Sequence, residues 1–305
     1  MVYYEIREVN GKKQNYLIYN KRENDKWVKQ SKFIGTGDIS KENVSKEKKK
    51  FELELILNKN YKYLAKKQVE EIEKLRQIYF EKVDKLSKEE FERFEHSFFT
   101  ELTYNSNAIE GSSLSLEDTS LVIDEHLAPK GKTVREIHEA ENHIQAIKFM
   151  KSYKGELNEE FILRLHGIIL KDISERFAGR YRESEVRIFG SAVKFPRSDV
   201  VPQLVKGLAY WYNKYKREYH PFEMAVIFSI KFVSIHPFVD GNGRMSRLLM
   251  NFILKKNKYP WINVYMKQRE DYLKAVRKSN DEDYSVVLEF MIKTLRENLR
   301  EFGFL

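Results

Sequence analysis

The chain of 305 residues contains no cysteine, which excludes disulfide bonds, thiol catalysis, iron–sulfur clusters and cysteine-ligated zinc. Only 13 glycines and 6 prolines are present, which argues against a turn-rich, all-β fold. No apolar run approaches the length of a membrane-spanning helix, and the first residues lack the hydrophobic stretch of a secretory signal peptide. We therefore expect an intracellular, cytoplasmic protein that does not associate with a membrane.

Charged residues are plentiful but unevenly distributed. Lys and Arg total 55 against 46 for Asp and Glu, a formal net charge of +9. Residues 1–60 contain 14 basic and 9 acidic side chains, so five of the nine excess positive charges lie there. Such an excess permits binding to nucleic acid or to an acidic partner, but composition alone does not establish either. Hydrophobic residues make up 42% of the chain, which is enough to bury a core.

The first part of the chain has the pattern of a small sheet followed by a helix. Apolar and polar residues alternate on both sides of Asn10 and Gly11, a pair that is typical of hairpin turns. A third short strand is expected near residues 27–34, ended by Gly35 and Gly37. From Ser40 onward the pattern becomes helical.

Beyond residue 88 the sequence is almost entirely helical in pattern, with apolar residues at helical spacing. One segment differs. Residues 185–196 alternate around Gly190 and Ser191, which predicts a short β-hairpin, and an isolated hairpin in a helical domain usually covers a site. Helices are expected at residues 88–103, 115–127, 133–153, 158–170, 200–215, 221–235, 244–255, 271–278 and 284–302.

Residues 236–247 form the most informative run, His-Pro-Phe-Val-Asp-Gly-Asn-Gly-Arg-Met-Ser-Arg. Gly241, Asn242 and Gly243 lie where a helix is expected to begin, and glycines there let successive backbone N–H groups point into one concavity that binds phosphate. The first three residues recur at 220–222 without the glycines and arginines, and we interpret that copy as a helix start with proline near the first helical position.

The side chains of this run add the remaining chemistry. Arg244 and Arg247 are three residues apart, hence on one helix face, and both can hold phosphate oxygens. Asp240 supplies a hard oxygen for Mg²⁺, and His236 can act as a base near neutral pH. A plain connector between two helices would not need this combination, which is what phosphoryl or nucleotidyl transfer requires.

The run resembles the motif of the Fic family, His-Pro-Phe-x-Asp/Glu-Gly-Asn-Gly-Arg-x-x-Arg, at every specified position. The flanking sequence at residues 179–182 and 248–251 agrees, and the resemblance extends over about residues 90–300. It implies a mainly α fold, a Fic-type helical bundle with a short β-hairpin flap, preceded by a small N-terminal α+β extension. The expected domains are a β-rich extension (1–60), a helical region with the inhibitory helix (61–112) and the Fic catalytic domain with C-terminal helices (113–305).

A second match lies upstream, where residues 106–111 read Ser-Asn-Ala-Ile-Glu-Gly and fit Ser/Thr-x-x-x-Glu-Gly/Asn, the inhibitory signature of the family. Ser106 and Glu110 share a helix face, and Gly111 can end that helix. A glutamate directed at the anion nest would mimic phosphate, and the resemblance names Arg247 as its partner. The resemblance therefore implies an inhibitory helix on the N-terminal side of the catalytic domain, as in class II relatives.

Two weaker candidates complete the set. Asn280 falls where relatives place an adenine-contacting asparagine, and Tyr272 lies nearby; exposed helix-end residues are the alternative.

His138 and His143 do not match a zinc site, because the zinc motif needs histidines four residues apart and these are five apart, so a solvated polar face is expected.

The resemblance implies a protein adenylyltransferase that uses ATP and Mg²⁺ and is autoinhibited by Glu110. His236 would take the proton from a Ser, Thr or Tyr hydroxyl of a target protein, or of the protein itself, and AMP would be transferred. A homodimer is also implied. Three alternatives stay open: Glu110-dependent removal of AMP from a modified protein, transfer of a different nucleotide or phosphate-linked group, and a nucleic-acid-associated regulator that uses the basic N-terminal region.

Overall fold

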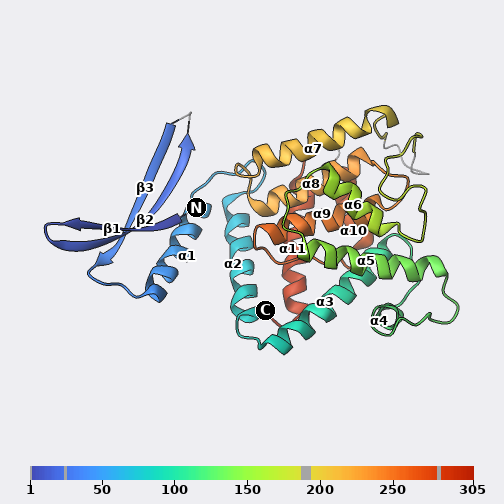
Figure 1. Ribbon diagram of the computed structural model, residues 1–305, viewed down its shortest axis with the longest axis horizontal. Helices are drawn as coiled ribbons and strands as arrows, with labels where there is room; N and C mark the ends of the chain where they lie inside the picture. The colour runs from blue at the N-terminus through green and yellow to red at the C-terminus, as the bar shows by residue number, and fades with distance from the viewer. Residues whose placement is uncertain (1, 24–25, 187–193, 280–282) are drawn as a thin grey trace. The chain divides into compact units, whose positions relative to one another are not determined.

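The computed structural model describes residues 2–23, 26–186, 194–279 and 283–305 (Figure 1). These residues form two compact units. The first comprises residues 1–60 and 65–73, and the second comprises residues 61–64 and 74–305. Within the described part of the chain, no helix is both long enough and apolar enough to span a lipid bilayer.

A three-stranded antiparallel sheet, one complete helix and residues 65–73, which begin the next helix, form the first unit. The strands follow one another in the order β1 (Val2–Val9), β2 (Lys12–Glu23) and β3 (Lys26–Thr36). The turn between β1 and β2 has positive φ at both Asn10 (52°) and Gly11 (70°), the conformation that two-residue hairpins require. The predicted hairpin and third strand are therefore confirmed.

Helix α1 (Lys41–Leu57) covers one face of this sheet. It begins at Ser40, whose side chain accepts a hydrogen bond from the backbone N–H of Asn43 at 3.2 Å. Phe51 of α1 is buried together with Val2 and Leu17 of the sheet, so the small core of the first unit lies between α1 and that face. The opposite face of the sheet has no part in this core.

The second unit is helical, as expected, and its centre is formed by two consecutive helices, α8 and α9, that pack against each other. Most side chains of both helices are buried, and α3, α6, α7 and α11 pack around them (Figure 1). The remaining turns include two short 3₁₀ segments at Ser198–Val200 and Met266–Gln268. The helices are α2 (Lys66–Val83), α3 (Lys88–Ile109), α4 (Leu116–Asp124), α5 (Val134–Ser152), α6 (Glu159–Ile169), α7 (Val201–Tyr215), α8 (Pro221–Ile235), α9 (Asn242–Lys256), α10 (Arg269–Lys278) and α11 (Ser285–Glu301).

Helix α3 corrects one predicted boundary. The sequence predicts a helix over residues 88–103 and a helical stretch from Ser106 to Glu110, whereas α3 runs without interruption from Lys88 to Ile109. The polar side chains are buried and bonded rather than solvated: Asn105 donates to the carbonyl of Glu101 at 2.9 Å and accepts from the backbone N–H of Met266 at 2.8 Å. The extra turns carry Ser106 toward the centre of the unit.

The motif copy at residues 220–222 behaves as predicted. His220 is the N-terminal cap of α8 and Pro221 is its first residue. The predicted flap hairpin centred on Gly190 and Ser191 falls mostly on residues 187–193, which lie outside the described residues.

Candidate active site

The loop between α8 and α9 takes its shape from two left-handed residues. His236 ends α8 with φ 50° and ψ 59°, a conformation that costs a non-glycine residue about 1 kcal/mol or more. Gly241 precedes α9 with φ 78°. A Cβ at position 241 would make only ordinary contacts with Ile169 and the ring of His166, so the backbone angle, and not a lack of space, is what favours glycine there.

Buried contacts hold the loop in place. The ring of Phe238 stacks on that of His166 with centroids 3.5 Å apart and planes at 3°. His166 accepts a hydrogen bond at Nδ1 from Gly179 N–H, at 3.1 Å, so the proton is on Nε2, which lies 3.1 Å from the carbonyl oxygen of Asp240. Asn242 donates to the carbonyl of Phe238 at 2.8 Å and accepts from its N–H at 3.0 Å. The side chain of Asn242 is thus used within the loop, which leaves its backbone N–H at the start of α9 for a ligand.

The imidazole of His236 has the state that a general base needs. It is half-buried and packs against the ring of Phe195, with centroids 4.2 Å apart. Burial lowers the pKa of His236, and the nearby charge of Arg182 lowers it further, against the opposite effect of the Val233 carbonyl. The ring is therefore neutral near pH 7. Within the described residues Nδ1 is buried without a hydrogen-bond partner, which leaves Nε2 as the nitrogen for proton transfer.

Arg182 holds the backbone of His236 in place by a hydrogen bond. Its side chain is fully buried, and its Nε donates to the carbonyl oxygen of His236 at 2.8 Å. The same guanidinium donates to the carbonyls of Ser184, at 3.1 Å, and of Pro196. One arginine thus connects the loop to both ends of the segment in which the flap is predicted.

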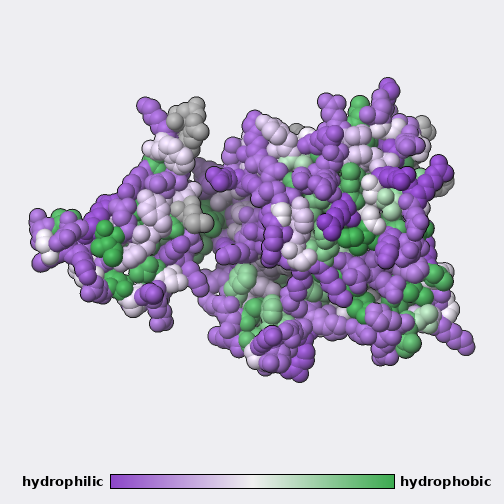
Figure 2. Space-filling view, viewed as in Figure 1, coloured by the Kyte–Doolittle hydropathy of each residue, from purple (hydrophilic) through white to green (hydrophobic). Residues whose placement is uncertain are grey.

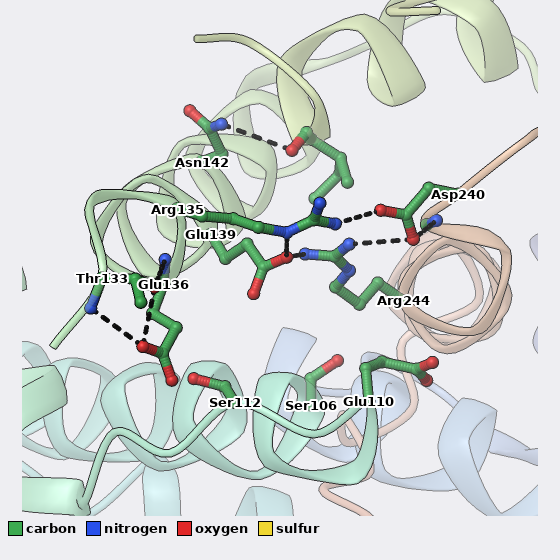
Figure 3. A network of polar contacts seen from close by, with 12 residues as sticks. Ser106, Glu110, Ser112, Thr133, Arg135, Glu136, Glu139, Asn142, Asp240 and Arg244 are labelled. Atoms are coloured by element: carbon green, nitrogen blue, oxygen red, sulfur yellow. Dashed lines mark hydrogen bonds and ion pairs between the residues drawn. The ribbon is translucent and has the colours of Figure 1, made fainter. Parts of the chain in front are cut away.

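Asp240 and Arg244 belong to a charged network that reaches α5 (Figure 3). The Arg244 guanidinium is 2% exposed and lies 3.2 Å from Glu139 and 3.5 Å from Asp240. Arg135 contacts both of those carboxylates. Burial opposes ionisation of Asp240, but Arg244, the N–H of Gly241 and Arg135 together lower its pKa. Asp240 is therefore an ionised, hard oxygen donor.

One donor of the network is unused. Nε of Arg244 is buried and has no hydrogen-bond partner within the described residues. Because an unsatisfied charged donor is expensive to bury, its position beside the N-terminus of α9 is suited to an anion. No group of three or more His, Cys, Asp or Glu side chains in the described part of the chain could hold a metal ion by itself.

Glu110 and Arg247 form an ion pair. Glu110 caps the end of α3, and its Oε1 lies 2.9 Å from Nη2 of Arg247. Arg247 is 4% exposed and also donates to Ser106, from Nε to Oγ at 3.1 Å and from Nη2 to the carbonyl at 2.8 Å. A methyl group at Gly243 would overlap the Glu110 carboxylate. The carboxylate therefore lies against the N-terminal turn of α9, where the sequence predicts the anion nest.

The remaining predicted residues have different outcomes. Tyr272 is 4% exposed rather than on an open helix end, and the Arg247 guanidinium lies 6.0 Å from its ring centre. Asn280 lies outside the described residues. The solvated face expected around His138 and His143 is wrong for His143, which is fully buried with Nδ1 3.0 Å from Thr103 Oγ1. Glu139, between the two histidines, pairs with Arg244.

Sequence reasoning missed Arg135, Glu139, His166 and Arg182. They lie outside the motif, and packing of α5, α6 and the segment after α6 brings them to the loop. Arg182 alone had a signal, since it is the last residue of the run 179–182 beside the predicted flap.

The part of the chain that contains this site is similar to known proteins. Residues 156–254 match the model of the Fic/DOC family. Residues 156–254 form a Fic domain. That match includes α6, α7, α8, the loop after α8 and all but the last two residues of α9, so the residues from Arg182 to Arg247 lie within it.

Curated relatives of this Fic domain are named protein adenylyltransferase Fic. The protein of that name from Nematostella vectensis is 31% identical over 194 residues, which are 62% of this chain and 45% of the relative. The one from Drosophila virilis is 30% identical over 200 residues, which are 64% of this chain and 41% of the relative. The chain thus matches less than half the length of these relatives.

Solved structures share the fold. A Fic family protein from Desulfovibrio desulfuricans is 26% identical with a TM-score of 0.66, over 80% of this chain and 76% of that one. A Fic-domain-containing signaling protein from Bacteroides thetaiotaomicron is 24% identical with a TM-score of 0.70, over 75% of this chain and 94% of that one. The second unit therefore has a Fic-type helical fold.

Proposed function

We propose that this protein is an adenylyltransferase that moves AMP from ATP to a Ser, Thr or Tyr hydroxyl of a target protein, or of itself. One observation carries the proposal: a neutral, half-buried His236 lies at the start of a loop whose far end is a helix N-terminus with two buried arginines, Arg244 and Arg247. A base beside an anion site fits attack of a hydroxyl on phosphorus.

Each residue has a part in this scheme. The N–H groups at the start of α9 and the free Nε of Arg244 bind the phosphates, and Nε2 of His236 accepts the hydroxyl proton. The hydroxyl oxygen forms a bond to the α-phosphorus, the bond to the leaving pyrophosphate breaks, and the proton stays on the imidazole until it passes to solvent. The ionised carboxylate of Asp240 suits Mg²⁺, which prefers few carboxylates plus phosphate oxygens and would neutralise phosphate charge when bound.

Glu110 restrains this activity in our proposal. Its ion pair with Arg247 occupies a guanidinium that would otherwise hold the γ-phosphate, and its carboxylate takes up space beside Gly243. ATP would then bind in an unproductive position. Homodimerisation accompanies the proposal as an implication of the family resemblance, and a cytoplasmic location accompanies it as the expectation from composition.

The test uses two variants and two labels. With ATP and Mg²⁺, Glu110→Gly should incorporate label from α-³²P ATP into itself or a partner, and mass spectrometry should find an AMP adduct. Label from γ-³²P ATP should not be incorporated; incorporation would indicate a kinase and contradict the proposal. The double variant Glu110→Gly, His236→Ala should be silent, and equal labelling by it would remove His236 as the base.

A second candidate function is removal of AMP from a modified protein. The position of the Glu110 carboxylate against the N-terminal turn of α9 favours it, because a carboxylate there could orient a water toward the α-phosphorus. The two functions respond oppositely to Glu110→Gly, which should raise AMP transfer but abolish AMP removal. A pre-labelled protein incubated with each form of the enzyme separates them.

A further inference from the structure

The three-stranded sheet of the first unit has one face that α1 does not cover. Directly opposite residues of paired strands lie on the same face, and residues two apart along a strand do so as well. Tyr16 is opposite Phe33, and Tyr3 and Ile18 are opposite each other. Lys32, next to Phe33, points to α1, where it lies 2.6 Å from Glu54. The aromatic residues therefore share the face away from α1.

Ile18, on the central strand of that face, is fully buried, and the exposed aromatic rings lie on the two edge strands. Trp27, six residues before Phe33 on the same regular strand, is 72% exposed, Phe33 is 52% exposed and Tyr3 is 40% exposed. Hydrophobic side chains on the surface of this unit are visible among hydrophilic ones (Figure 2). Exposed aromatic area of this kind is unfavourable in water and usually marks a binding surface.

Cations lie between the rings. The guanidinium of Arg7 is 4.3 Å from the centre of the Tyr16 ring, which itself contacts Phe33 at 5.5 Å. Arg7 and Lys29 share a single carboxylate, Glu5, at 2.6 Å and 3.1 Å. Two cations around one anion leave a positive charge on the face, in a segment that already has the excess of five described above.

We propose that this face binds single-stranded nucleic acid. Bases would stack on Trp27, Tyr3 and Phe33, and phosphates would pair with Arg7 and Lys29. Trp27 and Phe33 are six residues apart on one strand, about 20 Å, so several successive bases can be accommodated. Aromatic platforms in a cationic groove are the means by which proteins bind single strands without reading sequence.

The choice of a single strand follows from the rings. A duplex keeps its bases stacked inside and offers phosphates and groove edges, which would leave the exposed faces of Trp27 and Phe33 without a partner. An apolar protein surface would bury the rings but would leave Arg7 and Lys29 without enough anions. A single strand offers unpaired bases to the rings and phosphates to the cations. This proposal concerns residues outside the Fic domain and does not rest on the adenylyltransferase proposal.

The experiment uses the full chain and fluorescein-labelled dT12 and rU12 in anisotropy titrations at low salt. Trp27→Ala should weaken binding about tenfold, since stacking of one base contributes roughly 1–3 kcal/mol. Arg7→Ala and Lys29→Ala should each lower the slope of log K against log salt by about 0.7. Tyr210→Ala is the matched control, because Tyr210 is 67% exposed on α7 of the second unit. It should bind as wild type does.

Tryptophan fluorescence gives an independent measure, because the chain has only three tryptophans, of which Trp27 is exposed and Trp211 and Trp261 are half-buried. Addition of dT12 should quench the tryptophan fluorescence of the wild type and leave the fluorescence of the Trp27→Phe variant unchanged. Absence of binding to both oligonucleotides would overturn the proposal, as would equal weakening by Tyr210→Ala. Tighter binding of a duplex of the same length would also overturn it, in favour of a groove-binding sheet.

Discussion

Nη2 of Arg247 lies 2.9 Å from Oε1 of Glu110 and 2.8 Å from the carbonyl oxygen of Ser106. The ion pair joins the last turn of α3 to the second turn of α9, two helices that are far apart in the sequence. A nucleotide that binds the Arg247 guanidinium must therefore displace the Glu110 carboxylate at the end of α3, and not only water.

Ser106→Ala should weaken the restraint without removing it. The variant loses the hydrogen bond from Arg247 Nε to Ser106 Oγ, while the contacts to Glu110 and to the Ser106 carbonyl are retained. A lost hydrogen bond of this kind is worth about 1–2 kcal/mol, so self-labelling with α-³²P ATP should rise several-fold, less than in Glu110→Gly. Ser112→Ala, on the same segment, is the control. Reduced labelling would instead mean that Ser106 positions Arg247 for the reaction.

Arg182→Gln should change the pH profile of the Glu110→Gly enzyme. Arg182 lowers the pKa of His236 through its charge, and the base is active only when neutral, so activity is lost as pH falls through that pKa. Removing the charge should move the acid limb of kcat to higher pH and leave the KM for ATP unchanged. Arg180→Gln, an exposed neighbour, should keep the original profile. A lower kcat with an unmoved acid limb would limit Arg182 to packing.

Arg135→Ala should increase the affinity of the nucleotide-free protein for divalent cations. Arg135 contacts Asp240, the carboxylate that we assign to the metal, so a cation must displace or tolerate a guanidinium there. Electron paramagnetic resonance of Mn²⁺ should report binding several-fold tighter in the variant. Lys148→Ala removes an exposed cation from the same helix and should have little effect. Weaker Mn²⁺ binding in Arg135→Ala would contradict this competition.

Two buried histidines should destabilise the fold in mild acid. Burial lowers the pKa of His143 to about 3 and that of His166 to about 4, whereas an unfolded histidine titrates near pH 6.5. Below about pH 6.5 these histidines bind protons in the unfolded chain but not in the folded chain. The free energy of unfolding therefore falls as the pH drops toward 4. At pH 5 each of the two histidines should lower the free energy of unfolding by about 2 kcal/mol relative to neutral pH.

Urea unfolding at pH 7 and pH 5 measures this loss. His166→Gln should lose less stability between the two pH values than the wild type, even if it starts from a lower value. His126→Gln, at an exposed site, should follow the wild type. Equal losses in His166→Gln and the wild type would show that His166 is not the titrating group.

The chemistry of the loop could be predicted because it is local: base, anion nest and arginines lie within residues 236–247, and their spacing along one turn and one helix determines their placement. The support for the loop could not be predicted. Arg182, His166 and Glu139 reach it only through packing of other segments, and no spacing rule connects them to Asp240 or His236. The same reason applies to α3, which continues past the predicted end at residue 103 and whose Asn105 has a distant partner, the backbone N–H of Met266, that no spacing rule reveals.

Gly243 limits which mutations can relieve the inhibition of such a protein. The hydrogen atom at this position leaves room for the Glu110 carboxylate now and for a phosphate in the proposed reaction. A methyl group there would expel both, so a mutation at 243 cannot release the enzyme from its restraint and keep it working. Escape from inhibition must instead come from the α3 side, where Glu110 can be lost without altering the loop that would carry out the chemistry.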